Sequence, residues 1–324
     1  RIAVVRKYDL PLLLNTSVIR FRTADKSKLN NKYLFYFLQS KQFFEKIFEQ
    51  SQGSAQVNFG PTHLKLLNAY FPPILEQKKI AEILIFFDKY IHLLKLKIQK
   101  LQNLFIAQRQ ELLKNKLNWV EYKICEIADP LTKYSLTGGP FGSDLKASEY
   151  TQSGIRIIQL HNIGDGTFKD KNKIYTSIKK ANSLISSNIF SGDLIIAKMG
   201  DPVAKCTFIP KYLSRCLMSS DGIRLKVNKI KFNDYFIQIN INSPYFRKKI
   251  LRTTTGTTRQ RIGLKDFREL TIPCPSIKEQ ERISYILMSI EDSIRNLKKK
   301  VNLVEDLRKG LLSCLLLGKK RIKI

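Results

Sequence analysis

The sequence is poor in acidic residues. Its 324 residues contain 27 Asp and Glu against 57 Lys and Arg, which gives a net charge of +30. An imbalance of this size favours a polyanionic partner, and nucleic acid is the usual one. A genome rich in A and T would inflate the lysine count, but it would not explain the shortage of carboxylates. The composition therefore predicts a protein that binds nucleic acid.

Cysteine and histidine are also scarce. The five cysteines are scattered without a C-x-x-C pair, and the three histidines have no ligand spacing. These absences argue against a disulfide framework and against a zinc site, and they fit a reduced cytoplasm. The sequence has no apolar run of about 18 residues and no signal-peptide pattern. We therefore expect a cytoplasmic protein without a bound metal.

Catalytic motifs are missing as well. The glycine loops lack the G-x-x-x-x-G-K-[ST] pattern of a nucleotide-triphosphate site. Phe71-Pro72-Pro73-Ile74 superficially resembles an amino-methyltransferase motif but lacks the Asn or Asp that would hold the target amine. No pair of carboxylates suggests acid–base chemistry. The sequence therefore predicts a chain with no catalytic residues and no cofactor of its own.

The chain does contain a long internal repeat. Pro72–Lys116, which begins PPILEQKKIAEIL, recurs 203 residues later as Pro275–Lys319, which begins PSIKEQERISYIL. The displacement is constant, so Glu76-Gln77 aligns with Glu279-Gln280. A repeat must be found before the fold is predicted, and two copies indicate a duplicated protein rather than a solenoid.

Each copy predicts a long helix. The apolar residues are spaced alternately four and three apart, which is typical of a coiled coil. Two ordinary amphipathic core helices are the alternative. The simplest arrangement pairs the two seams in antiparallel fashion. The predicted seam residues are Ile80, Leu84, Phe87, Ile91, Leu94, Ile98, Leu101, Ile283, Leu287, Ile290, Ile294, Leu297, Val301 and Val304.

The repeat extends upstream of the long helices. Lys32–Ser51 has a helical apolar period that Asn233–Leu251 repeats, and its aromatic residues suit a core better than base stacking. A short strand is predicted at Leu67–Phe71 and again at Leu270–Pro273. Further strands are predicted at 3–5, 17–22, 119–122, 155–160 and 194–198. Residues 119–203 have no counterpart in the first copy, so we expect the first domain to be truncated at its N-terminus.

These features together resemble one family. They are the two P-x-x-x-E-Q-x-x-I segments, the glycine-Ser/Thr loops before them, PFGSDLK at Pro140–Lys146 and GDLIIAK at Gly192–Lys198. No single motif is specific, but their order and duplication resemble the specificity (S) subunit of Type I restriction-modification enzymes. The resemblance covers nearly the whole chain.

The resemblance implies an α+β protein with two target recognition domains, joined by two long antiparallel coiled-coil helices in an internal pseudo-repeat. Each domain would read one half of a bipartite site in double-stranded DNA, and the helices would set the gap. Such a subunit is not an enzyme. It recruits methylation (M) subunits, which use S-adenosylmethionine to methylate adenine, and the full enzyme adds restriction (R) subunits.

Carried onto this chain, the resemblance divides it into four segments. Residues 1–75 would be the C-terminal part of the first recognition domain, and 118–275 the second domain. The spacer helices would be 76–117 and 276–324. The first domain would lack the PFGS-like and GD-like segments, a departure from the family pattern.

Candidate DNA contacts follow from the chemistry of recognition. Arg reads guanine, Asn or Gln reads adenine, and Lys, Ser and Thr hold phosphates. For the loop 257–261 the alternative is a solvated turn with incidental charge, and we interpret His161 as structural or exposed. The candidates are Thr257, Thr258, Arg259, Gln260, Arg261, Lys146, Arg156, Gln159, Asn162, Lys198, Lys205, Gln56 and Asn58.

Two other hypotheses stay open. Two copies could associate through their helices, so that two second domains read a palindromic site. The rival from another class is a basic coiled-coil scaffold that binds proteins and touches DNA without regard to sequence.

Overall fold

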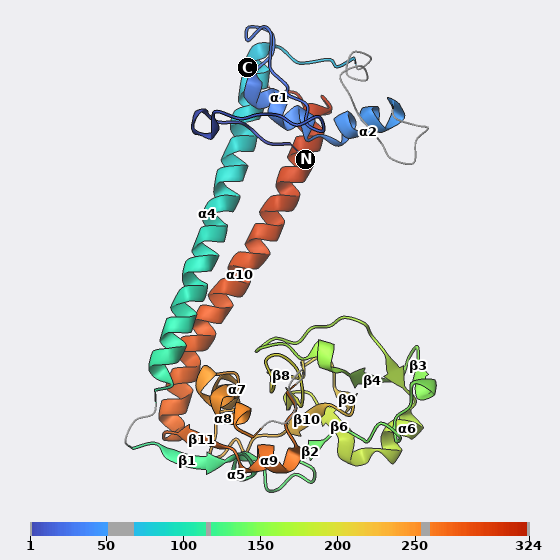
Figure 1. The fold of residues 1–324 in the computed structure, drawn as a ribbon, viewed down its shortest axis with the longest axis vertical. Coiled ribbons are helices and arrows are strands. Elements are labelled where there is room, and N and C mark those ends of the chain that lie inside the picture. The colour runs from blue at the N-terminus through green and yellow to red at the C-terminus, as the bar shows by residue number, and fades with distance from the viewer. Residues whose placement is uncertain (1, 51–67, 115–117, 254–259, 323–324) are drawn as a thin grey trace. The chain divides into compact units, whose positions relative to one another are not determined.

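The chain folds as two compact units in a computed structural model (Figure 1). Unit 1 consists of Arg1–Gln102 with Asp292–Ile324, and unit 2 of Asn103–Glu291. The structure describes residues 2–50, 68–114, 118–253 and 260–322.

Two long helices correspond to the two copies of the repeat. Helix α4 spans Ile74–Leu112 with 39 residues, and α10 spans Ile277–Leu316 with 40 residues. At about 1.5 Å per residue each is close to 60 Å long. Pro73 precedes the first helix, and the Ser276 hydroxyl accepts a hydrogen bond from the Glu279 amide at the start of the second. The prediction of two long helices is confirmed.

In unit 1 the two helices pack side by side in antiparallel orientation. Lys95 of α4 lies 2.7 Å from Glu305 of α10, and Asp88 lies 2.5 Å from Arg308. The residue number falls along one helix as it rises along the other, which sets the direction. The central seam residues cluster between the helices as predicted: Phe87, Ile91, Leu94, Ile98, Leu297, Val301 and Val304.

The ends of the predicted seam do more than pair two helices. Ile80 and Leu84 are fully buried in the core of unit 1, together with the aromatic residues of the short helices there. Ile283 and Leu287 are fully buried in the core of unit 2. At these positions the apolar stripe of each long helix belongs to the core of a unit, because short helices pack against the same stripe.

The described residues of unit 2 form an α+β domain with three sheets. The four-stranded sheet has the order β2-β10-β7-β8, the five-stranded sheet β3-β5-β4-β9-β6, and β1 pairs with β11. All pairs are antiparallel except β4 with β9. The strands are β1 (Val120–Lys123), β2 (Leu136–Gly138), β3 (Tyr150–Thr151), β4 (Ile155–Ile158), β5 (Tyr175–Thr176), β6 (Asn188–Phe190), β7 (Leu194–Ala197), β8 (Cys206–Phe208), β9 (Arg215–Met218), β10 (Gly222–Leu225) and β11 (Thr271–Cys274).

Short helices connect and cover these sheets. The helices of unit 2 other than the two long ones are α5 (Ile124–Ile127), α6 (Ile178–Ser183), α7 (Asp234–Ile241), α8 (Pro244–Leu251) and α9 (Leu264–Glu269). Trp119, Phe236 and Ile272 belong to one buried cluster, in which helices α7 and α9 meet the two-stranded and four-stranded sheets. This core holds the loops at the strand ends in place.

Each predicted aromatic helix is in fact a pair. Unit 1 has α1 (Asn31–Leu38) and α2 (Lys41–Gln50), and unit 2 has α7 and α8 at the equivalent positions. The break falls at a serine in both copies, because Ser40 and Ser243 accept hydrogen bonds from the amides three residues later and start a new helix. Most of the aromatic side chains of α1 are buried, as predicted, whereas Phe48 of α2 is 60% exposed.

No strand forms in the described part of unit 1, so the strands predicted at 3–5, 17–22 and 68–71 are wrong there. In unit 2 the repeat-related strands β10 and β11 pair with β7, β2 and β1, all of which belong to residues 118–203. Among residues 2–50 and 68–114 no such partner strand forms, and a strand depends on its partner's hydrogen bonds. None of the described helices has an apolar stretch that could span a lipid bilayer.

Candidate nucleic-acid interface

The GD motif of the second copy is part of the fold. Gly192 adopts a φ of +83° ahead of β7, and the buried Asp193 carboxylate lies 2.7 Å from the Nε of Arg224 on β10. The Phe190 amide donates a second contact to this carboxylate, at 3.0 Å. Burial raises the pKa of Asp193, whereas Arg224 and the amide favour the charged form. The motif therefore joins the turn before β7 to β10, the strand that pairs with β7.

Lys198, at the end of β7, packs against the turn that precedes β10. Its ammonium group donates a hydrogen bond to the Ser220 carbonyl at 3.1 Å. Burial lowers the pKa of Lys198, and Arg261 acts in the same direction. Arg261 in turn lies 3.3 Å from the Asp221 carboxylate. Two predicted contacts, from distant parts of the sequence, thus meet at one turn.

The backbone around Lys198 brings in a third predicted contact. The Ile262 amide donates to the Lys198 carbonyl at 2.9 Å, and the Gly200 amide donates to the Gln260 carbonyl at 3.3 Å. The segment that carries Gln260 and Arg261 therefore runs beside the end of β7. Arg261 keeps 52% of its side chain exposed, so its guanidinium is available to a ligand.

The PFGS loop lies against the same turn. A Cβ atom built on Gly139 would stand 1.8 Å from the Ser219 carbonyl oxygen, so only glycine allows this approach. Further along the loop, Phe141 is 82% exposed and Lys146 is exposed. The cluster formed by Lys198, Gln260, Arg261 and the PFGS loop is called the strand-end cluster below.

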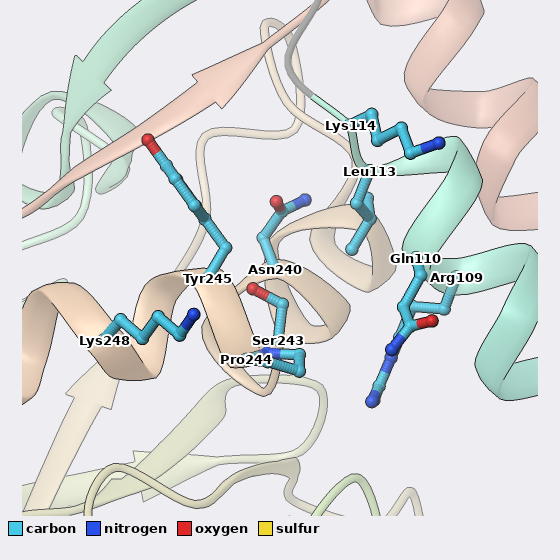
Figure 2. A pocket seen from close by; sticks show the side chains of 9 residues that line it. All are labelled: Arg109, Gln110, Leu113, Lys114, Asn240, Ser243, Pro244, Tyr245 and Lys248. Carbon is cyan, nitrogen blue, oxygen red and sulfur yellow. The ribbon is translucent and has the colours of Figure 1, made fainter.

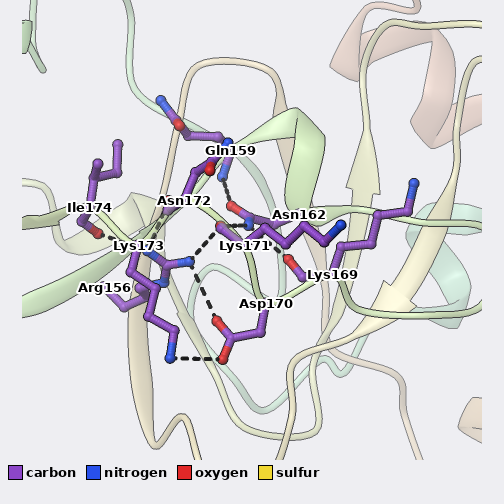
Figure 3. Close-up of polar contacts among 9 residues, drawn as sticks. All are labelled: Arg156, Gln159, Asn162, Lys169, Asp170, Lys171, Asn172, Lys173 and Ile174. Atoms are coloured by element: carbon purple, nitrogen blue, oxygen red, sulfur yellow. Dashed lines mark hydrogen bonds and ion pairs between the residues drawn. The ribbon is translucent and has the colours of Figure 1, made fainter. Parts of the chain in front are cut away.

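Two predicted contacts, Arg156 and Asn162, are instead buried, and Figure 3 shows their polar contacts with neighbouring residues. Arg156 is 3% exposed and Asn162 is fully buried. Asn162 donates to the carbonyls of Lys169 and Lys171 at 2.9 and 2.8 Å, and accepts from the Gln159 amide at 3.0 Å. The prediction that these two side chains contact DNA is corrected, because their polar groups are engaged inside the domain.

Other predicted contacts have mixed outcomes. Gln159 is half-buried, and the Lys205 ammonium donates to the Asp201 carbonyl at 2.9 Å. His161 is exposed. The candidates Gln56, Asn58, Thr257, Thr258 and Arg259 lie outside the described residues and stay predictions.

Sequence reasoning missed the lysines that follow Asn162. Lys169, Lys171 and Lys173 are all exposed and lie on the loop that Arg156 and Asn162 hold. The sequence pattern that could have predicted them is the alternation of lysine in KDKNK, residues 169–173, which has no counterpart in the first copy.

A pocket of about 500 Å³ lies in unit 2 where the end of α4 meets α7 and α8 (Figure 2). Arg109 contributes to it, and burial lowers the pKa of this guanidinium. Within the described residues its Nε has no hydrogen-bond partner. The positions related to Arg109 and Asn240 by the 203-residue repeat are Leu312 and Phe37, which pack in the core of unit 1 instead. The lining residues are Arg109, Gln110, Leu113, Lys114, Asn240, Ser243, Pro244, Tyr245 and Lys248.

The described residues contain no group of three or more His, Cys, Asp and Glu that could hold a metal ion. Burial raises the pKa of Cys216 and of Cys274 to about 12, so neither thiol is a nucleophile near neutral pH.

Known proteins share both the sequence pattern and the fold. The model of the Type I restriction modification DNA specificity domain matches residues 2–103 and 118–306. The Type I restriction enzyme MjaVIII specificity subunit of Methanocaldococcus jannaschii is 23% identical over 96% of this chain and 75% of its own length. The Type I restriction enzyme EcoKI specificity subunit of Escherichia coli is 23% identical, over 83% of this chain and 62% of that protein.

Solved structures give the same fold. The crystal structure of a Type-I restriction-modification system S subunit from M. genitalium superposes with a TM-score of 0.54 at 19% identity, over 90% of this chain and 74% of that one. A chain from a structural study of complex assembly in the type I R-M system reaches a TM-score of 0.59 at 15% identity, over 90% and 72%. Since the family model matches most of its residues, the chain belongs to the family of Type I restriction modification DNA specificity domains.

Proposed function

We propose that the chain is the non-catalytic DNA-recognition subunit of a Type I restriction-modification complex and reads a bipartite site. The observation that carries this proposal is the strand-end cluster, in which Lys198, Gln260 and Arg261 converge with a glycine loop. The exposed guanidinium of Arg261 beside a close backbone turn suits a nucleic acid, since phosphates take lysine and backbone amides and guanine takes arginine.

Recognition would proceed in two stages. The basic surface docks on DNA through phosphate contacts, which weaken steeply as salt rises. Side chains of the strand-end cluster then read base edges in the groove, with Arg261 as the first candidate because half of its side chain is exposed. The continuous helices α4 and α10 would set the gap between the two half-sites.

Partner subunits would supply the chemistry. The methylation subunits hold S-adenosylmethionine, and restriction subunits join in the full enzyme. Exposed apolar side chains on the helix pair support a protein partner: Phe86 and Leu93 of α4 are 63% and 61% exposed, and Leu303 of α10 is 71% exposed.

Methylome mapping tests this function directly. The chain is co-expressed with its methylation subunit, and methylated adenines are located across the genome by long-read sequencing. A split motif with a fixed gap is the expected result, and a palindrome would indicate two associated copies. A stable complex that methylates no defined motif would overturn the recognition role.

The same exposed apolar residues favour a second candidate, a coiled-coil interaction scaffold. In that case DNA binding would vary with salt but not with DNA sequence. Competition between duplexes with and without the mapped motif separates the two candidates.

A further inference from the structure

One loop of unit 2 is fixed from the inside by two buried polar side chains. This segment, Lys169–Ile174, is called the lysine loop. The Nη1 of Arg156 donates to the carbonyls of Asn172 and Ile174 at 3.2 and 3.4 Å, and Nη2 donates to that of Lys171 at 3.1 Å.

Asn162 fixes the other half of the loop. Its side-chain amide nitrogen donates to the carbonyls of Lys169 and Lys171, and its backbone carbonyl accepts from the Lys169 amide at 2.8 Å. A buried guanidinium or amide is tolerated only when its hydrogen bonds are made. The two Nη groups of Arg156 and the side-chain amide nitrogen of Asn162 all donate to carbonyls of this loop, which is therefore preorganised, while the Arg156 Nε has no partner among the described residues.

The lysine side chains of the lysine loop face solvent. Residues 169 to 173 are all exposed, and Asn172 has a φ of +49°. The one carboxylate present, Asp170, lies 3.5 Å from Arg156 and 3.2 Å from Lys173. Lys169 and Lys171 form no ion pair with any described residue, so their charges are available.

An exposed aromatic ring stands beside the loop. Tyr212, on the segment between β8 and β9, is 66% exposed. Burial, the negative charge of Asp170 and a side-chain hydrogen bond with that carboxylate raise the pKa of Tyr212. The surface thus combines fixed lysines with a ring that can contact a sugar or base.

We propose that the lysine loop is a DNA-phosphate contact of the second recognition domain, with Lys169 and Lys171 as contact residues and Arg156 and Asn162 as positioning residues. This inference rests on the proposed function. Lysine is a compact point charge that suits phosphate, whereas it is depleted at protein–protein interfaces. A rigid loop also loses little entropy when it binds.

The test measures how binding depends on salt. The complex of the chain with its methylation subunit is titrated with a labelled duplex of about 30 base pairs that carries the mapped motif, at several salt concentrations. Each lost phosphate contact should reduce the slope of log K against log salt by about 0.9. Lys169→Gln with Lys171→Gln should therefore reduce it by about 2, and Lys169→Arg with Lys171→Arg should keep it.

Two matched variants separate charge from position. Lys231→Gln with Lys278→Gln removes two other exposed lysines of unit 2 and should leave the slope nearly unchanged. Arg156→Lys keeps the positive charge but removes the guanidinium group that donates hydrogen bonds to three loop carbonyls. It should weaken binding several-fold with an unchanged slope, since the loop lysines remain.

The outcomes are distinguishable. If the double glutamine variant keeps the wild-type slope while the methylated motif persists, the lysine loop is not a phosphate contact and the recognition role stands. If that variant instead loses its methylation subunit, the loop is a protein interface and the inference is overturned. If the wild-type complex methylates no motif, the proposed function itself fails.

Discussion

Gln77 and Gln280 make the same hydrogen bonds 203 residues apart. The side-chain carbonyl of Gln77 accepts from the Asn30 amide at 2.8 Å, and that of Gln280 accepts from the Asn233 amide at 2.9 Å. Both glutamines are 1% exposed. The glutamine of each E-Q pair therefore ties the start of each long helix to the N-cap of the short helix beside it.

Replacing either glutamine should destabilise its own unit. Gln280→Ala leaves the Asn233 amide and the Pro275 carbonyl, 2.9 Å from the Gln280 amide nitrogen, without these bonds. A buried group left unsatisfied costs about 1–3 kcal/mol, so we expect a loss of that size in denaturant unfolding. Gln102→Ala, on the exposed face of α4, is the control and should change stability little. Equal effects of the two substitutions would contradict the buried role.

Glu76 should make unit 1 sensitive to acid. Its carboxylate accepts from the Arg321 guanidinium at 2.6 Å and from the Ile322 amide at 3.1 Å. The Arg321 hydrogen bond lowers the pKa of Glu76 below its ordinary value near 4.5, although partial burial opposes the shift. A lowered pKa in the folded state contributes stability above pH 4.5, which is lost as pH falls through the folded value. The free energy of unfolding of unit 1, measured from pH 6 to pH 3, should show this loss. Glu76→Gln should make that free energy less dependent on pH over the same range.

Removing one partner of the buried Asp193–Arg224 ion pair should strongly destabilise the domain. Asp193→Ala leaves the Arg224 guanidinium buried without its carboxylate, 2.7 Å away in the native domain. Breaking a buried pair in this way costs about 3–5 kcal/mol. The exposed pair of Asp292 with Arg295 is the matched comparison, and Asp292→Ala should cost less than about 1 kcal/mol. Thermal unfolding of both variants measures the difference.

Gly139, which directly precedes the PFGS loop, and Gly142 within the loop should tolerate substitution differently. A Cβ on Gly139 would collide with the Ser219 carbonyl, whereas a Cβ on Gly142 would meet nothing within 4 Å. Gly139→Ala should therefore lower stability by about 1–3 kcal/mol and weaken DNA binding through the strand-end cluster. Gly142→Ala should leave stability unchanged, and a comparable loss of stability there would contradict the steric explanation.

The helix pair should determine the gap between half-sites. Deleting seven residues, two helical turns, from both α4 and α10 keeps the seam in register and shortens each helix by about 10 Å. Methylome mapping should then show the same half-sites with a shorter gap. A changed half-site with an unchanged gap would contradict the spacer role.

The sequence by itself determined the duplication, the two long helices and the family. These properties depend on local periodicity and on a constant displacement, both of which are visible along one dimension. The heptad rhythm at Ile91, Leu94, Val301 and Val304 predicted the antiparallel seam because a narrow apolar stripe must face a partner helix.

Only the tertiary structure decided which polar residues face outward. Arg156 and Lys169 carry the same charge in the sequence, yet the first is buried under the lysine loop and the second is exposed on it. The strands predicted at 3–5 and 17–22 failed for a related reason. Strand pairing and burial depend on contacts between residues far apart in the chain, and no local pattern reports whether the partner is in place.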